Sequence, residues 1–183
     1  LAFLSKCFSI EENTQIYFCT VDHKLRPESS REAKKTRKNL KKFGINCETL
    51  NLVKKNINSN IQSKARKGRY DLIIQKCNKK KITFILTGHH KNDLYENFFI
   101  RLFRGSGLKG LSSFSKTKSN LKKNNNVHIL RPLLNVSKNE LFYITKNTFN
   151  FHINDPSNEN EIFLRIRLRN LIDQSVKEGL SFK

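Results

Sequence analysis

Two short apolar runs, each followed at once by polar residues, constrain the fold of this chain more than any other feature. The first is IYFCTV at residues 16–21, and the second lies within KITFILTG at residues 81–88. Both have the length and the β-branched content of buried strands. Helical patterns separate them and follow the second run, so strands and helices alternate along the chain. This order predicts an α/β fold built on a doubly wound, mainly parallel sheet.

The rest of the chain supplies the other elements of such a fold. A polar helix follows the first strand, and we expect Ser29 or Ser30 as its N-cap and Gly44 at its end. The further elements expected, in chain order, are an edge strand over residues 45–52, a helix over 60–81, a helix from about residue 93, a short strand over 128–130, a helix from Ser137 and a helix over 163–172. Residues 116–126, which are basic and almost without apolar side chains, are predicted to form a mobile loop that is either a solvated linker or an RNA contact.

Charge indicates the class of partner. The 183 residues include 36 Lys and Arg against 15 Asp and Glu, for a formal net charge of +21. A field of this strength favours a polyanion or an anionic membrane surface, and because the cations recur along the whole chain we expect a nucleic acid. No apolar run approaches the roughly 20 residues that span a bilayer. The four cysteines form no C-x-x-C pair, which is typical of thiols in a reducing cytoplasm.

The predicted ligand site lies where the two buried strands end. Ligands of doubly wound sheets bind at the carboxyl ends of the strands, and both TVDH (residues 20–23) and LTGHH (residues 86–90) occupy such ends. Asp93 follows closely, and its carboxylate suits Mg²⁺ bound to nucleotide phosphates; the alternative is a carboxylate that serves only as a partner of the helix dipole. One of His89 and His90 is expected to face the cleft, where it would polarise a group or transfer a proton.

Two helices are expected to carry cationic side chains for RNA. In the first, Asp93, Asn97, Arg101 and Arg104 make one polar stripe at helical spacing, while Phe98, Phe99 and Leu102 are predicted to face the sheet. In the second, Arg165 and Arg169 lie one turn apart on a common face, where they would grip phosphates.

Several of these motifs together resemble one family. The runs VDHKLRPES, ARKGRYDLI, LTGHHKNDLYENFFIRLFRGSGLKGL, RPLLNVSKNEL and NDPSNENEIFLRIRLRN stand in the order seen in the catalytic domain of the tRNA(Ile)-lysidine synthetase family. The resemblance implies a Rossmann-like fold of the adenine nucleotide alpha-hydrolase type and a cytoplasmic ligase that forms a carbon–nitrogen bond. It implies ATP and Mg²⁺ as cofactors, and L-lysine and isoleucine tRNA with a CAU anticodon as partners. ATP would adenylate the wobble cytidine, and the lysine ε-amine would then displace AMP.

The resemblance also implies roles for individual residues. Those implied are catalytic roles for Asp93, His89 and Arg69, ATP contacts for Asp22, His23 and Thr87, RNA contacts for Arg165, Arg169, Arg101 and Arg104, and a metal-ligand role for Asp93. The chain departs from the family pattern at Asn92 and Asn97, where the family has an aspartate and a threonine.

The family's phosphate-binding loop, a Ser-Gly-Gly-x-Asp-Ser run, is expected immediately before Leu1, together with a central strand of the sheet. We therefore expect a chain truncated at its N-terminus and inactive by itself, with a partial α/β domain over residues 1–135 and a helical extension over 136–183. Two alternatives stay open: a tRNA thiolation ATPase of the same fold, and a non-catalytic basic RNA-binding module. The oligomeric state, monomer or homodimer, stays open as well.

Overall fold

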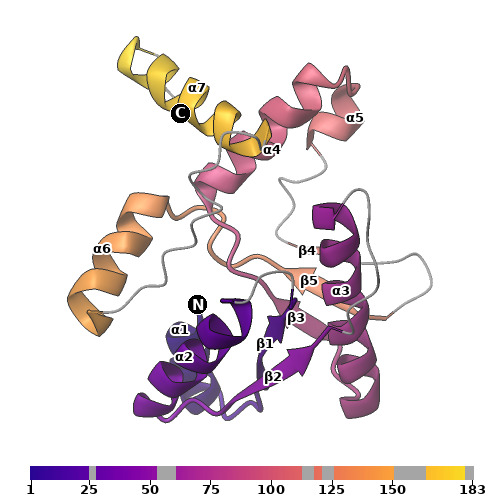
Figure 1. Ribbon diagram of the computed structural model, residues 1–183, viewed down its shortest axis with the longest axis vertical. Coiled ribbons are helices and arrows are strands. Elements are labelled where there is room, and N and C mark those ends of the chain that lie inside the picture. Colours follow the sequence, from indigo (N-terminus) through magenta and orange to yellow (C-terminus); the bar gives the residue numbers. More distant parts are fainter. Residues whose placement is uncertain (25–27, 53–60, 113–117, 121–125, 151–163, 180–183) are drawn as a thin grey trace. The chain divides into compact units, whose positions relative to one another are not determined.

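The computed structural model describes residues 1–24, 28–52, 61–112, 118–120, 126–150 and 164–179 (Figure 1). The chain forms two compact units, Leu1–Thr83 and Phe84–Lys183. The boundary expected near residue 135, which separates a catalytic domain from its helical extension, stays a prediction. The DPSN motif at residues 155–158 and the middle of VDHKLRPES at residues 25–27 lie outside the described residues.

The first unit has a parallel β-α-β arrangement at its centre. Its elements are α1 (Ala2–Glu11), β1 (Phe18–Asp22), α2 (Ser29–Lys42), β2 (Cys47–Asn51) and α3 (Ile61–Lys80). β1 and β2 pair in parallel, with Phe18 opposite Cys47 and Asp22 opposite Asn51. α2 connects the two strands and packs against both. The predicted strands and helices of this half of the chain are therefore confirmed.

The sequence predicts the end of α2 correctly and its N-cap wrongly. The predicted stop is confirmed, because Gly44 adopts a left-handed φ of +66° just beyond the helix. There the ammonium of Lys6, from α1, donates a hydrogen bond of 2.7 Å to the carbonyl of Phe43. The predicted cap is wrong, because Glu28 precedes the helix and Ser29 and Ser30 are its first two residues. Both serine hydroxyls donate instead to the carboxylate of Asp22.

The second unit contains a small mixed sheet and four helices among its described residues. Its elements are β3 (Phe84–Leu86), α4 (Lys91–Phe103), α5 (Leu108–Leu111), β4 (Lys118–Asn120), β5 (His128–Leu130), α6 (Lys138–Phe149) and α7 (Leu164–Lys177). The strand order is β3-β5-β4, with β3 parallel and β4 antiparallel to β5. Ile85 and Ile129, which lie opposite each other, are both buried. The short strand predicted at residues 128–130 is confirmed.

β4 corrects the prediction of a mobile loop over residues 116–126. Its three residues lie inside that segment and pair with β5 from Lys118 opposite Leu130 to Asn120 opposite His128. Strand pairing satisfies backbone donors and acceptors whatever the side chains are, and a basic composition does not prevent it at the edge of a sheet. Composition alone therefore gave the wrong answer for these residues.

α4 buries a different face from the one predicted. Phe98 and Leu102, which were expected to face the sheet, are exposed, and the residue that α4 buries is Glu96. α4 packs against α7, and Figure 1 shows the two helices side by side. The arginines of α7 give the Glu96 carboxylate its partners, and this pairing decides which face of α4 is covered.

α6 begins where the sequence predicts. The Ser137 hydroxyl accepts a hydrogen bond of 3.2 Å from the Glu140 amide, and the Glu140 carboxylate accepts one of 2.7 Å from the Ser137 amide. This reciprocal pair is a capping box, which satisfies two amides that the helix itself leaves unbonded. None of the described helices combines the length and the apolar character needed to cross a bilayer.

We expect Ser137→Ala in the intact protein to lower the free energy of unfolding by about 1 kcal/mol, because a helix amide loses its acceptor. Asn139→Ala, two residues further along the same helix, is the matched control and should have little effect. Urea unfolding followed by circular dichroism measures both. Equal midpoints for the two variants would contradict the capping role.

Candidate active site

The start of α4 is organised by the Asp93 carboxylate. His90 is the N-cap, and its backbone amide donates a hydrogen bond of 3.1 Å to Oδ2 of Asp93, whose own amide bonds back to the His90 carbonyl at 3.0 Å. The His90 ring Nε2 lies 3.5 Å from the same oxygen. A carboxylate in the first turn also favours the helix dipole. The helix-end role that the sequence left open for Asp93 is therefore present.

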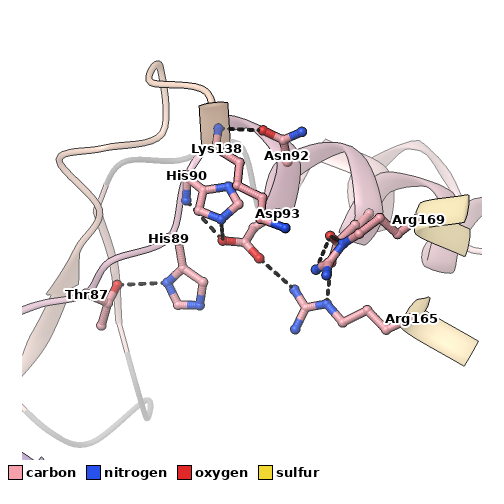
Figure 2. A network of polar contacts seen from close by, with 9 residues as sticks. Thr87, His89, His90, Asn92, Asp93, Lys138, Arg165 and Arg169 are labelled. Carbon is pink, nitrogen blue, oxygen red and sulfur yellow. Dashed lines mark hydrogen bonds and ion pairs between the residues drawn. The ribbon is translucent and has the colours of Figure 1, made fainter. Parts of the chain in front are cut away.

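The other carboxylate oxygen of Asp93 is also occupied. Its Oδ1 lies 3.2 Å from Nη2 of Arg165, so Asp93 stands between His90 and Arg165 (Figure 2). No group of three His, Cys, Asp or Glu side chains able to hold a metal ion occurs in the described part of the chain. A cation at Asp93 would have to displace the Arg165 guanidinium. The arrangement therefore does not fit the predicted role of Asp93 as a metal ligand.

A buried carboxylate that we did not predict lies one turn further along α4. Glu96 is only 2% exposed. Its Oε2 accepts a bond of 2.6 Å from Nε of Arg165, and its Oε1 lies 2.8 Å from Nε and 2.6 Å from Nη2 of Arg169. An ionised carboxylate at such depth is stable only with partners of this kind. The spacing of Asp93 and Glu96 on one helix, and of Arg165 and Arg169 on another, was the available signal.

The two arginines of α7 therefore have internal partners. Arg165 binds both Asp93 and Glu96, and Arg169 binds Glu96. The guanidinium of Arg165 remains more open to solvent than that of Arg169. Their predicted contact with RNA stays a prediction. Within the described residues, both guanidinium groups form ion pairs with carboxylates of α4.

Thr87 and His89 lie together at the carboxyl end of β3. The Thr87 hydroxyl is 2.8 Å from Nδ1 of His89 and 3.4 Å from the Leu130 carbonyl of β5, to which the Thr87 amide also bonds at 2.9 Å. When the hydroxyl donates to Leu130 it accepts from Nδ1–H of His89, and Nε2 is then the basic nitrogen of the ring. The backbone of the sheet thus orients His89, which Figure 2 shows beside Thr87.

The two asparagines that depart from the family pattern have local structural partners. Oδ1 of Asn92 accepts a bond of 2.8 Å from the Lys138 amide at the start of α6. Oδ1 of Asn97 accepts a bond of 2.8 Å from Nε of Arg101, whose Nη1 donates to the Gly110 carbonyl at 3.0 Å. Arg101, predicted to contact RNA, therefore holds α5 against α4.

In the first unit, Asp22 ends β1 and anchors the residues that follow it. Its Oδ1 accepts bonds of 2.9 Å from both the Lys24 amide and the Ser29 hydroxyl, and its Oδ2 accepts one from Ser30. Burial disfavours the charged form of Asp22, but the bonds from Ser30, Lys24 and Ser29 outweigh it and lower the pKa of this carboxyl. The predicted contact of Asp22 with ATP stays a prediction, because the carboxylate already serves these three donors.

His23 and Arg69 form the part of the first unit best suited to an anion. His23 Nδ1 and Arg69 Nε are buried and lack hydrogen-bond partners within the described residues. Burial, and then the charge of Arg69, lower the pKa of His23 against the opposing effect of Asp22. Buried polar atoms without partners are rare and costly in folded proteins. A guanidinium with an unused donor fits a phosphate or another anion here.

Parallel strands joined by helices, with polar clusters at the strand ends, are the architecture of nucleotide-binding α/β domains, and the profile of the PP-loop domain family matches residues 1–176. The chain belongs to the PP-loop family, whose members bind ATP. Among the proteins it resembles are enzymes named tRNA(Ile)-lysidine synthase. That of Orientia tsutsugamushi (strain Boryong) is 40% identical over 173 residues, which cover 94% of this chain and 38% of the relative. That of Rickettsia bellii (strain OSU 85-389) is 36% identical, over 92% of this chain and 38% of the relative.

A third relative covers the whole chain. The tRNA(Ile)-lysidine synthase of Rickettsia rickettsii (strain Sheila Smith) is 34% identical over all 183 residues, which make up 36% of its own length. The chain thus spans well under half of the curated relatives it matches. Among solved structures, a U34-tRNA thiolase, NcsA from Methanococcus maripaludis with its 4Fe-4S cluster, superposes with a TM-score of 0.74. The two sequences are 15% identical, and the superposition covers 97% of this chain and 62% of the thiolase chain. This likeness shows the predicted Rossmann-like fold of the adenine nucleotide alpha-hydrolase type.

We expect Glu96→Gln to destabilise the intact protein by about 2 to 3 kcal/mol, because it leaves two arginines facing a neutral group. The cost stays below that of a fully buried pair because Arg165 reaches solvent. Glu48→Gln is the matched control, since Glu48 pairs with Lys76 at an exposed site and should contribute under about 1 kcal/mol. Hydrogen exchange of the α7 amides measures whether the helix loosens. Equal protection in both variants would contradict the anchoring role of Glu96.

We expect stability to depend on pH through Asp22. Its pKa is lower in the folded chain than the usual value of about 3.9, so its contribution is complete above that pH and is lost as pH falls toward the folded-state pKa. Asp22→Asn should lower the urea midpoint at neutral pH and remove this part of the acid dependence. Glu11→Gln, at an exposed position of α1, should leave the pH profile unchanged. Parallel acid profiles for Asp22→Asn and the unaltered protein would contradict the assignment.

Proposed function

We propose that this chain is the ATP-binding part of an enzyme that ligates L-lysine to the wobble cytidine of isoleucine tRNA with a CAU anticodon. The observation that carries the proposal is the identity of 34–40% with proteins named tRNA(Ile)-lysidine synthase over nearly the whole chain. Membership of the PP-loop family supports ATP as the nucleotide. The excess of 21 positive charges suits a tRNA, and such an enzyme would work in the cytoplasm.

In this proposal the first unit receives the nucleotide. Arg69 uses its free Nε–H on a phosphate oxygen, and His23, kept neutral at pH 7 by burial and by Arg69, lies beside the adenosine. Asp22 contributes by holding the Lys24 amide, next to His23, and the Ser29 hydroxyl at the start of α2. A positive charge fixed at the phosphates stabilises the negative charge that builds up as pyrophosphate leaves.

The second unit supplies the base that accepts a proton from the lysine amine. ATP transfers its adenylyl group to the carbonyl oxygen of the cytosine and releases pyrophosphate. The lysine amine then attacks the ring carbon that bears this oxygen, while the C–O bond to AMP breaks. The attacking amine must lose a proton. His89 accepts it at Nε2, since Nδ1 is held by the Thr87 hydroxyl. Thr87 therefore positions the base in this proposal, in place of the ATP contact first expected.

Mg²⁺ enters the proposal as the ion that accompanies ATP, and we assign it no ligand among the described residues. Both oxygens of Asp93 serve the start of α4 and the Arg165 contact. The role of Asp93 is then to position His90, and with it the adjacent His89, at the end of β3. No step of the reaction is assigned to the ion.

The alternative of a tRNA thiolation ATPase has less support. Persulfide or thiolate chemistry needs a reactive cysteine, and burial raises the pKa of Cys19, Cys47 and Cys77, which disfavours their thiolate forms. The structural likeness to a thiolase is a likeness of fold alone. A non-catalytic RNA-binding module would not require the oriented His89 or the unsatisfied Arg69.

We expect Asp93→Asn in the intact protein to slow AMP release on the order of 10²-fold, with a much smaller effect on tRNA binding, because the geometry of the catalytic groups is lost while the basic surface is kept. Asp173→Asn, at an exposed position of α7, is the control and should leave the rate unchanged. The assay measures AMP release with tRNA, ATP and Mg²⁺, with and without lysine.

Two results would count against the proposal. An unaltered rate in Asp93→Asn would remove Asp93 from the active site. A tRNA product that gains sulfur, and no lysine, would replace lysidine formation with thiolation.

A further inference from the structure

The segment that joins α4 to α6 has an unusual charge pattern. Between Glu96 and Glu140 the sequence contains nine Lys and Arg and no Asp or Glu. The described part of this segment also exposes large apolar side chains: Phe103 is 62% and Leu108 is 86% exposed. Apolar side chains and unopposed cations thus share the C-terminal end of α4 and the short helix α5. We call this the α4–α5 surface and define it by Phe98, Leu102, Phe103, Arg104, Leu108 and Lys109.

The aromatic part of the α4–α5 surface is held in place. The ring of Phe103 stacks on that of Phe99 at a centroid distance of 6.3 Å and an interplanar angle of 29°. Phe99 in turn meets Phe98 edge to face, with centroids 5.5 Å apart. A ring supported on one side and exposed on the other offers a flat surface at little cost in side-chain entropy. Phe103 is therefore preorganised to stack on a further planar group.

The helical part is held as well. Arg101 reaches from α4 to the Gly110 carbonyl at 3.0 Å, and the Ser106 amide bonds back to the Arg101 carbonyl at 2.9 Å. These bonds fix α5 against the end of α4. Arg104 and Lys109 lie on the two sides of this turn, and both are exposed. One cation, Arg104, thus follows Phe103 directly at the end of α4, and the other, Lys109, lies on α5, which these bonds hold in place.

Charge decides which partner such a surface accepts. A second copy of the chain would bring Arg104 and Lys109 against identical residues, and like charges at an interface oppose association. A polyanion with planar groups meets both requirements, because its phosphates neutralise the cations and its bases stack on the ring. Duplex RNA hides its base faces, whereas unpaired nucleotides expose them.

We propose that the α4–α5 surface binds unpaired RNA, with a base stacked on Phe103 and phosphates on Arg104 and Lys109. The proposal rests on the proposed function, since it names the part of the chain that receives single-stranded nucleotides of the tRNA. It assigns Phe103 a role that the sequence motifs did not. It also distinguishes Arg104, which faces the RNA, from Arg101, which holds the surface together.

The test compares a short unstructured oligocytidine RNA with a blunt RNA duplex of the same length, by fluorescence anisotropy on the intact protein. We expect Phe103→Ala to weaken binding of the single strand about 10-fold, with the duplex little affected and the salt dependence unchanged. Phe103→Trp should retain the affinity. Arg104→Gln combined with Lys109→Gln should reduce the slope of log affinity against log salt by roughly 1.4. Tyr143→Ala, 69% exposed on α6, is the matched aromatic control and should bind as the unaltered protein does.

Each failure has its own signature. Binding of the single strand by Phe103→Ala with unaltered affinity would overturn the α4–α5 surface and leave the proposed function standing. A protein that binds neither RNA nor tRNA would overturn both. Self-association that Phe103→Ala abolishes, with RNA affinity unchanged, would assign the surface to a second copy of the chain and overturn the proposal. If Phe103→Ala does not fold, Phe103→Trp and the double glutamine variant decide the matter.

Discussion

The second unit depends on one interaction, the burial of the Glu96 carboxylate between Arg165 and Arg169. Removing a carboxylate from water is costly, and two guanidinium groups with short bonds to separate oxygens offset that cost. Because Arg165 also reaches Asp93, the same contact joins α7 to the first turn of α4. The position of His89 and His90, immediately before that turn, therefore depends on a helix more than sixty residues further along the chain.

Each unit uses the same device at the end of a strand. Asp22 is the last residue of β1 and accepts bonds from the start of α2, and Asp93, in the first turn after β3, accepts a bond from the N-cap of α4. In both places a carboxylate satisfies donors that the helix and the preceding turn leave open. The acids that seemed free to bind a ligand are thus used to shape the turns. In the described part of the first unit, Arg69 and His23 have unsatisfied buried nitrogens that suit an anion.

The arginines predicted to contact RNA divide by the same reasoning. Arg165, Arg169 and Arg101 have bonds within the second unit, and each fixes one helix on another. Arg104 is exposed at the end of α4, beside the ring of Phe103. A formal charge of +21 favours a polyanion over the molecule as a whole, whereas recognition of unpaired bases requires a supported aromatic surface. In the proposed RNA interface, attraction and recognition are thus carried by different residues.

The sequence by itself determined the elements whose signals are local. The apolar runs of β1 and β3, the stop at Gly44 and the capping box at Ser137 each depend on a few neighbouring residues, and all are present. The motifs likewise predicted membership of the PP-loop family, and the family match confirms it. Tertiary structure alone decided that α4 buries Glu96 and exposes Phe98, and that Ser29 and Ser30 serve Asp22. The physical reason is that a polar side chain takes whichever partner the fold brings near it, and for Glu96 the partners lie 69 and 73 residues away, beyond the reach of any local pattern.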